Sequence, residues 1–132
     1  MGLFKRILGI CETRQPADSG CWNYSEGKLE IDLKKAPELS TPGGALRFEG
    51  NKLSERVLVF QGNNGQYHAL RNKCAHMGRR LDMLNGTEHV QCCSVSKSTY
   101  DYNGQIISGP VKDGVKAFQV SVENDKLVVL LN

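Results

Sequence analysis

The sequence predicts an all-β protein, an antiparallel β-sandwich or small barrel preceded by a short N-terminal helix. Short runs of β-type residues recur along most of the chain, and turn residues separate them about every eight to twelve positions. In two neighbouring runs, Val57, Val59, Tyr67 and Ala69 fall on alternate positions, which would place them on one inward face. The length of 132 residues fits one domain. We therefore expect a single domain over 1–132.

Within that domain, we expect an N-terminal helix and extension at 1–26 and a β domain at 27–132. Apolar residues at positions 3, 4, 7, 8 and 10 form a helical repeat of about two turns, which Gly9 weakens and the polar segment 12–20 ends. Such a helix is too short to hold a bilayer alone. We expect it to dock on the domain, in preference to a membrane surface or a partner.

The predicted strands follow from residue 27 onwards. Gly62-Asn63-Asn64-Gly65 and Glu123-Asn124-Asp125 have the composition of hairpin turns, because Asn, Asp and Gly tolerate the positive φ that such turns require. The runs that we expect to form strands lie at 28–33, 46–49, 56–61, 67–71, 90–92, 98–102, 105–107, 118–122 and 127–131.

Composition and charge exclude several functional classes. The net charge of +3, from 17 basic and 14 acidic residues, is too small for a nucleic-acid binder. The chain has no apolar run of about 18 residues and no signal-peptide pattern, so we expect no membrane span and a soluble, cytoplasmic protein. It also has no catalytic triad order, phosphate-binding loop or dinucleotide motif, which makes an enzyme acting alone an unfavoured interpretation.

Five cysteines, at positions 11, 21, 74, 92 and 93, are an odd number. In a reducing cytosol such residues are more often metal ligands or thiols than disulfides. Cys11 and Cys21 flank a turn, and we expect two unrelated buried thiols there rather than a small disulfide clip. Cys92 and Cys93 are adjacent, and neighbouring side chains diverge in an extended chain.

Two segments carry the chemistry of a metal site. Cys74 and His76 are separated by one residue, so both can point toward one centre. A second segment follows, with 15 residues between His76 and Cys92 and 16 between His76 and Cys93. Thiolate sulfur and imidazole nitrogen are ligands for zinc or for iron-sulfur centres, and not for magnesium or calcium.

The first segment resembles the Rieske family, whose pattern is Cys-x-His-x-Gly-x-x-Leu followed about 15 to 17 residues later by Cys-Pro-x-His-Gly and then Phe-Asp. The matching residues are Cys74-Ala75-His76-Met77-Gly78-Arg79-Arg80-Leu81 and, in place of Phe-Asp and its Gly turn, Tyr100-Asp101-Tyr102-Asn103-Gly104. The resemblance spans about residues 28–131. It implies a Rieske-like antiparallel fold and a two-iron, two-sulfur cluster held by two thiolates and two imidazoles.

The second segment departs from the family at the second histidine. If Cys92 takes the cysteine position, Val95 stands where the histidine belongs; if Cys93 takes it, Ser96 does. Three arrangements therefore stay open at this point. The metal ligands are Cys74, His76, Cys92 and Cys93; or they are Cys74, His76, Cys93 and Ser96; or no cluster is bound. A mononuclear zinc or iron site from the same cysteines and histidine is a further alternative.

The resemblance implies a soluble one-electron carrier of unusual ligation, and the alternative is a cluster-free interaction or regulatory module. The cysteine that shields the cluster in respiratory Rieske proteins would fall at Arg79, so the chain is more similar to the soluble Rieske ferredoxins. Arg79, Arg80 and Lys97 crowd the two segments and would attract an acidic redox partner.

Four further residues are expected to be structural. His68 alternates within a strand, and His89 lies on the strand that enters the second segment, three residues before Cys92. Tyr100 should fill the core as the family's aromatic residue does. Trp22 is the chain's single tryptophan, and we expect it to pack in the core rather than to stack on a substrate.

Overall fold

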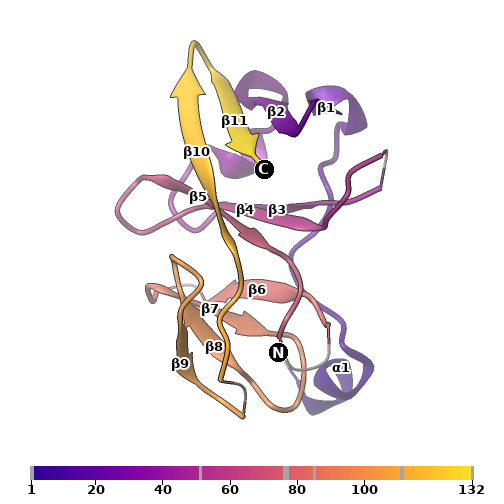
Figure 1. The fold of residues 1–132 in the computed structure, drawn as a ribbon, viewed down its shortest axis with the longest axis vertical. Coiled ribbons are helices and arrows are strands. Elements are labelled where there is room, and N and C mark those ends of the chain that lie inside the picture. The colour runs from indigo at the N-terminus through magenta and orange to yellow at the C-terminus, as the bar shows by residue number, and fades with distance from the viewer. Residues whose placement is uncertain (1, 51, 76–77, 85, 111, 132) are drawn as a thin grey trace.

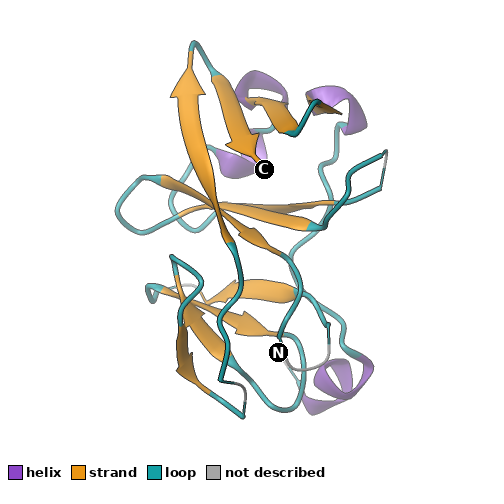
Figure 2. Ribbon diagram, viewed as in Figure 1, coloured by secondary structure: helices purple, strands orange, loops and turns teal. Residues whose placement is uncertain are grey.

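The structure is a computed structural model that describes residues 2–50, 52–75, 78–84, 86–110 and 112–131. Two antiparallel sheets and one short helix make up the fold (Figures 1 and 2). The elements are α1 (Leu3–Leu8), β1 (Trp22–Ser25), β2 (Lys28–Asp32), β3 (Ala45–Phe48), β4 (Val57–Gln61), β5 (Tyr67–Arg71), β6 (Leu81–Leu84), β7 (His89–Cys92), β8 (Thr99–Asp101), β9 (Ile106–Ser108), β10 (Ala117–Glu123) and β11 (Lys126–Leu130), with short 3-10 turns at Ser19–Cys21, Leu33–Lys35 and Pro37–Leu39.

The larger sheet has seven strands in the order β1-β2-β11-β10-β5-β4-β3, and the smaller has four in the order β6-β7-β8-β9. Every strand pairing is antiparallel. Figure 1 shows the small sheet and α1 at one end of the molecule and the β10–β11 hairpin at the other. The predicted all-β class is therefore confirmed, although most strands belong to one large sheet rather than to two or three small ones.

Strand β4 is shared by two hydrophobic cores. Its five residues are all buried, because alternate side chains enter different cores. Val57 and Val59 pack in the core enclosed by the large sheet. Leu58 and Phe60 pack with Leu70 of β5 in a second core against the small sheet. From the sequence, one face of this hairpin was expected to point inward. The structure buries the other face as well. Burial on both faces fixes the position of the segment that follows β5.

The predicted strands match the observed ones to within a few residues, with two exceptions. β1 has a half-exposed alternating pattern at the sheet edge and was expected to be part of the extension, so the sheet begins at Trp22. β6 contains Asp82, a buried carboxylate that obscures an otherwise apolar run. The two predicted turns join β4 to β5 and β10 to β11, and Asn124 and Asp125 have positive φ. The division of the chain into one domain with an extension at 1–26 stays a prediction.

The helix α1 ends at Gly9, which has a left-handed φ of 69° that suits glycine. The helix docks on the domain, as expected from the sequence, but it does so through Arg6 and not through its apolar face. Arg6 is the buried residue of the helix, and its large apolar side chains are exposed. Across the described ranges, no helix has the length and apolar character needed to cross a membrane.

Candidate metal centre

The first candidate ligand segment is a tight loop between β5 and β6. Cys74 N–H donates to the carbonyl of Arg79 at 2.7 Å, and Gly78 N–H donates to the carbonyl of Cys74 at 2.9 Å. The buried side chain of Asn72 accepts from Leu81 N–H at 2.6 Å and closes the base of the loop. Arg56 donates to the carbonyls of Asn72 and Gly78 and fastens the loop to the start of β4. These bonds direct the Cys74 side chain inward, where it is 1% exposed.

The second segment is the turn that joins β7 to β8. Cys92 N–H donates to the carbonyl of Ser98 at 2.8 Å, and Lys97 N–H donates to the carbonyl of Ser94 at 3.2 Å. Lys97 takes a left-handed φ of 53°, which lets the chain reverse within a few residues. Cys93 N–H donates to the carbonyl of Arg80 at 3.0 Å and holds the turn against the first segment. The two segments therefore lie side by side at one end of the fold.

The sulfurs of Cys74 and Cys92 are brought together between the two segments. The Tyr100 hydroxyl lies 3.3 Å from Cys74 Sγ, and the Ser94 hydroxyl lies 3.2 Å from Cys92 Sγ. Burial raises the pKa of the Cys92 thiol to about 11; the Ser94 hydroxyl opposes this rise and the neighbouring Cys74 thiol adds to it. Burial, and then Cys74, also raise the pKa of Tyr100. Two buried sulfurs, each beside a hydroxyl group, could supply the thiolate half of a metal site.

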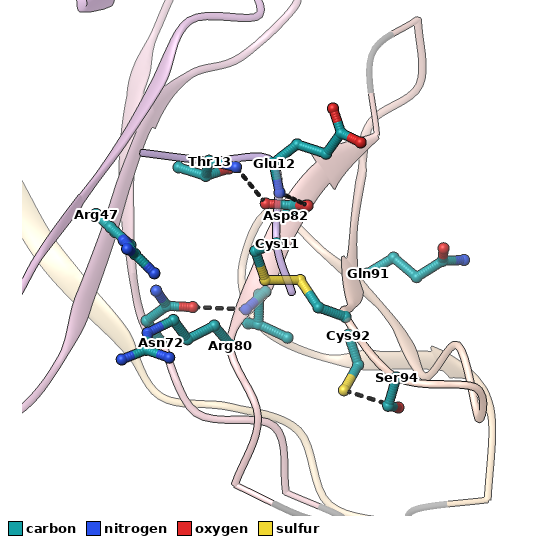
Figure 3. Close-up of a disulfide and its surroundings, with 12 residues drawn as sticks. Cys11, Glu12, Thr13, Arg47, Asn72, Arg80, Asp82, Gln91, Cys92 and Ser94 are labelled. Carbon is teal, nitrogen blue, oxygen red and sulfur yellow. Dashed lines mark hydrogen bonds between the residues drawn. A yellow bond between two sulfur atoms is a disulfide. The ribbon is translucent and has the colours of Figure 1, made fainter. Parts of the chain in front are cut away.

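Cys93 faces the opposite way and forms a disulfide with Cys11. Cys92 is the last residue of β7 and Cys93 follows it, and adjacent side chains diverge in an extended chain. Figure 3 shows the sulfur of Cys92 directed away from the disulfide. The expectation that Cys11 is a thiol is therefore wrong, whereas Cys21 is a buried thiol, unrelated to Cys11. In the structure, the Cys93 sulfur is bonded to Cys11; its role as a metal ligand stays a prediction.

The segment around Cys11 is held by two further anchors. Arg6 donates to the carbonyls of Cys92 and Ser94, at 3.3 and 3.1 Å, and to the side chain of Gln91 at 2.7 Å. The buried carboxylate of Asp82 accepts from the backbone N–H groups of residues 12 and 13 at 2.7 and 2.8 Å (Figure 3). An Asp82 oxygen and the two disulfide sulfurs lie within 4.8 Å of one another. No sequence pattern pointed to the disulfide or to Arg6.

The remaining predicted site residues have varied surroundings. His76 lies outside the described residues, so its position as a ligand stays a prediction. Ser96 is half-buried, and its hydroxyl lies 2.7 Å from that of Ser94, which in turn contacts Cys92 Sγ. Arg80 forms a bidentate ion pair with Glu49, with N–O distances of 3.1 and 2.7 Å. Arg80 was expected to face a partner. This role stays a prediction, and the ion pair with Glu49 does not favour it.

Arg79 is half-buried like Arg80, whereas Lys97 is exposed. The Arg79 guanidinium lies against the backbone of Gly9, at the end of α1. Lys97 is exposed at the turn of the second segment. Tyr100 and Trp22 behave as predicted: Tyr100 is fully buried, and Trp22 packs edge-on against Phe48 with ring centroids 5.6 Å apart.

The other two histidines of the chain lie away from the sulfurs. His68 stacks on Phe60, with ring centroids 5.3 Å apart, and also contacts Tyr102. Its burial lowers its pKa, as expected for a structural histidine. His89 lies at the start of β7, opposite Asp101 of β8, and is half-buried. Because the sequence holds three histidines, His76 is the one imidazole that belongs to the ligand segments.

Comparison with known proteins identifies the family. The Rieske 2Fe-2S domain matches residues 32–119 of this chain, so the chain belongs to the Rieske family. The family is one of two-iron, two-sulfur electron carriers. The match covers both ligand segments, all four strands of the small sheet and strands β3, β4 and β5 of the large sheet. It confirms the resemblance to the Rieske family that the sequence indicated.

Individual relatives agree with this assignment. The chain is 26% identical over 103 residues to the cytochrome b6-f complex iron-sulfur subunit of Chlorobaculum tepidum, a match that spans 77% of this chain and 55% of that protein. The fold is similar to the ferredoxin of carbazole 1,9a-dioxygenase from Nocardioides aromaticivorans IC177, with a TM-score of 0.61 and 19% identity over 72% of this chain and 93% of that one. It is also similar to the cyanobacterial plasma membrane Rieske protein PetC3 from Synechocystis PCC 6803, with a TM-score of 0.55 and 22% identity over 65% of this chain and 85% of that one.

A standard Rieske cluster has two thiolates on one iron and two imidazoles on the other. Cys74 and Cys92 fit the thiolate half, because their sulfurs are buried together between the two segments. The imidazole half does not fit, because one histidine belongs to the segments and Val95 or Ser96 stands at the position of the other. In sequence, the two ligand segments therefore contain one of the two histidines of the standard set.

The buried thiols should make the metal-free protein less stable at alkaline pH. The pKa values of Cys21 and Cys92 rise from 9.0 to about 11 on folding, chiefly through burial. Between these values the unfolded chain loses protons that the folded protein keeps, so the free energy of unfolding should fall by up to about 1.4 kcal/mol per pH unit for each thiol. Urea unfolding from about pH 8 to pH 10 measures this slope. A Cys21→Ser variant should lose about half of the pH-dependent slope that Cys21 and Cys92 cause together. A slope equal to that of the wild type would contradict the raised pKa of Cys21.

Proposed function

We propose that this chain is a one-electron carrier that holds a two-iron, two-sulfur cluster of non-standard ligation. The observation that supports the proposal most is the meeting of Cys74 and Cys92 between two segments that come from different hairpins. Thiolates are the ligands that an iron-sulfur cluster requires, and two buried sulfurs supplied by two neighbouring segments suit that role. When bound, the cluster would supply reversible one-electron chemistry.

The proposed ligands on the first iron are Cys74 and Cys92. The Tyr100 and Ser94 hydroxyls would donate hydrogen bonds to these sulfurs, which favours the more negative, reduced state of a centre. On the second iron we propose His76, by its position in the family motif. Ser96 is the candidate for the remaining position, because its hydroxyl connects through that of Ser94 to Cys92 Sγ.

The assignment differs from the first ligand set that the sequence suggested. Cys93 serves in our proposal as the anchor of the N-terminal segment, through its disulfide with Cys11. We propose that a redox protein is the partner, docking at the end of the fold where the two segments lie. Lys97 and Arg79 are the basic residues at this end that would favour an acidic partner surface.

A reductive titration under anaerobic conditions tests this function. The purified protein should be bleached by dithionite with the uptake of one electron for each pair of irons. Each imidazole on the centre can couple one proton to that electron, which lowers the potential by about 59 mV per pH unit as the pH rises. With His76 alone, we expect one such proton, half of the dependence that two imidazoles allow. A dependence on two protons would contradict the proposed ligation.

The same titration separates the alternatives. A mononuclear zinc site would bind one metal ion without sulfide and would take up no electron. A cluster-free interaction module would also take up no electron. The observation in favour of this module is the Cys11–Cys93 disulfide, which removes one candidate ligand sulfur from the site. Either outcome would replace the electron-carrier proposal.

A further inference from the structure

The helix α1 is turned with its charge inward and its apolar residues outward. Arg6 is buried, whereas Leu3 and Phe4 are 67% and 73% exposed and Ile7 is 56% exposed. A surface helix of a folded protein normally buries its apolar stripe and exposes its charges. The exposed apolar residues, which we call the helix patch, are Leu3, Phe4, Ile7, Leu8 and Ile10.

This orientation is fixed by three separate attachments. The Arg6 guanidinium is hydrogen-bonded to the β7–β8 turn through the carbonyls of Cys92 and Ser94. The Cys11–Cys93 disulfide ties the end of the segment to the same turn. Asp82 accepts two backbone N–H groups directly after Cys11 (Figure 3). These attachments lie on the side of α1 that faces the small sheet, so they hold the helix patch outward.

Basic residues surround the helix patch. Lys5 is exposed on the helix and lies 3.8 Å from Glu12, an exposed carboxylate. The Arg79 guanidinium lies against Gly9 at the end of the helix. The turn held by Arg6 carries Val95, which is exposed and apolar, and Lys97, which is exposed and basic. The surface is thus apolar at its centre and mainly cationic around it.

We propose that the helix patch binds the surface of a membrane that contains anionic lipids, with α1 lying in the interface. An apolar helix face next to Lys and Arg is the combination that interfacial helices use. The helix is too short to hold a bilayer alone, but it is attached to the β7–β8 turn, which adds the exposed Val95 and Lys97 to the same surface. Five large side chains that are 44% to 73% exposed offer roughly 600 Å², which is short of the roughly 800 Å² per partner of a stable protein interface. The patch also has no side chain that could make the hydrogen bonds typical of such an interface. The inference does not depend on iron binding.

Co-sedimentation with lipid vesicles tests this inference on the full chain. The wild type should sediment with vesicles of phosphatidylcholine mixed with phosphatidylglycerol, and much less with phosphatidylcholine alone. Raising the salt concentration should weaken binding, because the basic residues contribute through screened charge attraction. Ile7→Gln should weaken binding about tenfold, which corresponds to about 1.4 kcal/mol.

Ile107→Gln is the matched control. Ile107 lies on β9 and is 47% exposed, so the same substitution is made at a similar exposure away from α1. Vesicle binding by this variant should equal that of the wild type. Equal weakening by both variants, or no binding to mixed vesicles, would overturn the inference. So would a dimer in sedimentation equilibrium that Ile7→Gln dissociates, because the occupant would then be a second copy of the chain.

Discussion

Cys92→Ser is expected to abolish iron binding, whereas Cys93→Ser is expected to leave it intact. Cys92 Sγ lies with Cys74 between the two ligand segments, whereas Cys93 Sγ is bonded to Cys11. Replacing a thiolate ligand by a hydroxyl removes one of the two sulfurs that hold the first iron. The measurement is iron and acid-labile sulfide per chain after anaerobic purification, where we expect the wild type to hold about two of each.

The controls for this experiment come from the same chain. Cys74→Ser should lose iron as Cys92→Ser does. Cys21→Ser should retain iron, because Cys21 is equally buried but packs in the core of the large sheet. Retention of iron by Cys92→Ser together with its loss from Cys93→Ser would show that Cys93 is the ligand and would contradict our assignment.

Cys11→Ser is expected to lower the free energy of unfolding by about 4 kcal/mol. The disulfide joins residues separated by 82 positions, and the chain-entropy model gives about 4 to 5 kcal/mol for closing a loop of this size in the unfolded chain. Urea unfolding of the metal-free protein measures the change. Adding a dithiol reductant should destabilise the wild type by a similar amount.

The same reductant provides the control for the disulfide. It should have no effect on Cys11→Ser, which has no bond at this position to reduce. The Arg6 and Asp82 attachments remain in the variant, so the N-terminal segment should stay in place at low denaturant. A loss of less than about 1 kcal/mol would indicate that the disulfide does not constrain the unfolded chain as the model requires.

The hairpin of β4 and β5 and the start of the first ligand segment could be predicted from sequence, because local patterns specify both. Alternating apolar residues defined the hairpin, and Cys74 follows its second strand directly. β6 was missed because Asp82 interrupts its apolar pattern. Its burial is explained only by two backbone N–H groups from a segment about 70 positions earlier, and no local pattern carries such information.

The second ligand segment shows why the site could be predicted only in part. The side chains of the adjacent Cys92 and Cys93 diverge, as expected from the sequence. The partner of Cys93 lies 82 positions away, and nothing in the spacing of five cysteines indicated that pairing. The inward orientation of Arg6 was likewise hidden, because two of its three partners are backbone carbonyls, which any residue type supplies, and all three lie more than 80 positions away.

We propose above all that this Rieske-family chain carries an iron-sulfur cluster although one family histidine is absent. Metal and sulfide analysis of the wild-type protein, purified and reconstituted without oxygen, tests it most directly. If the cluster is present, we expect a coloured protein with about two irons and two acid-labile sulfides per chain. A colourless protein that stays free of iron after reconstitution, or that holds one zinc and no sulfide, would contradict it.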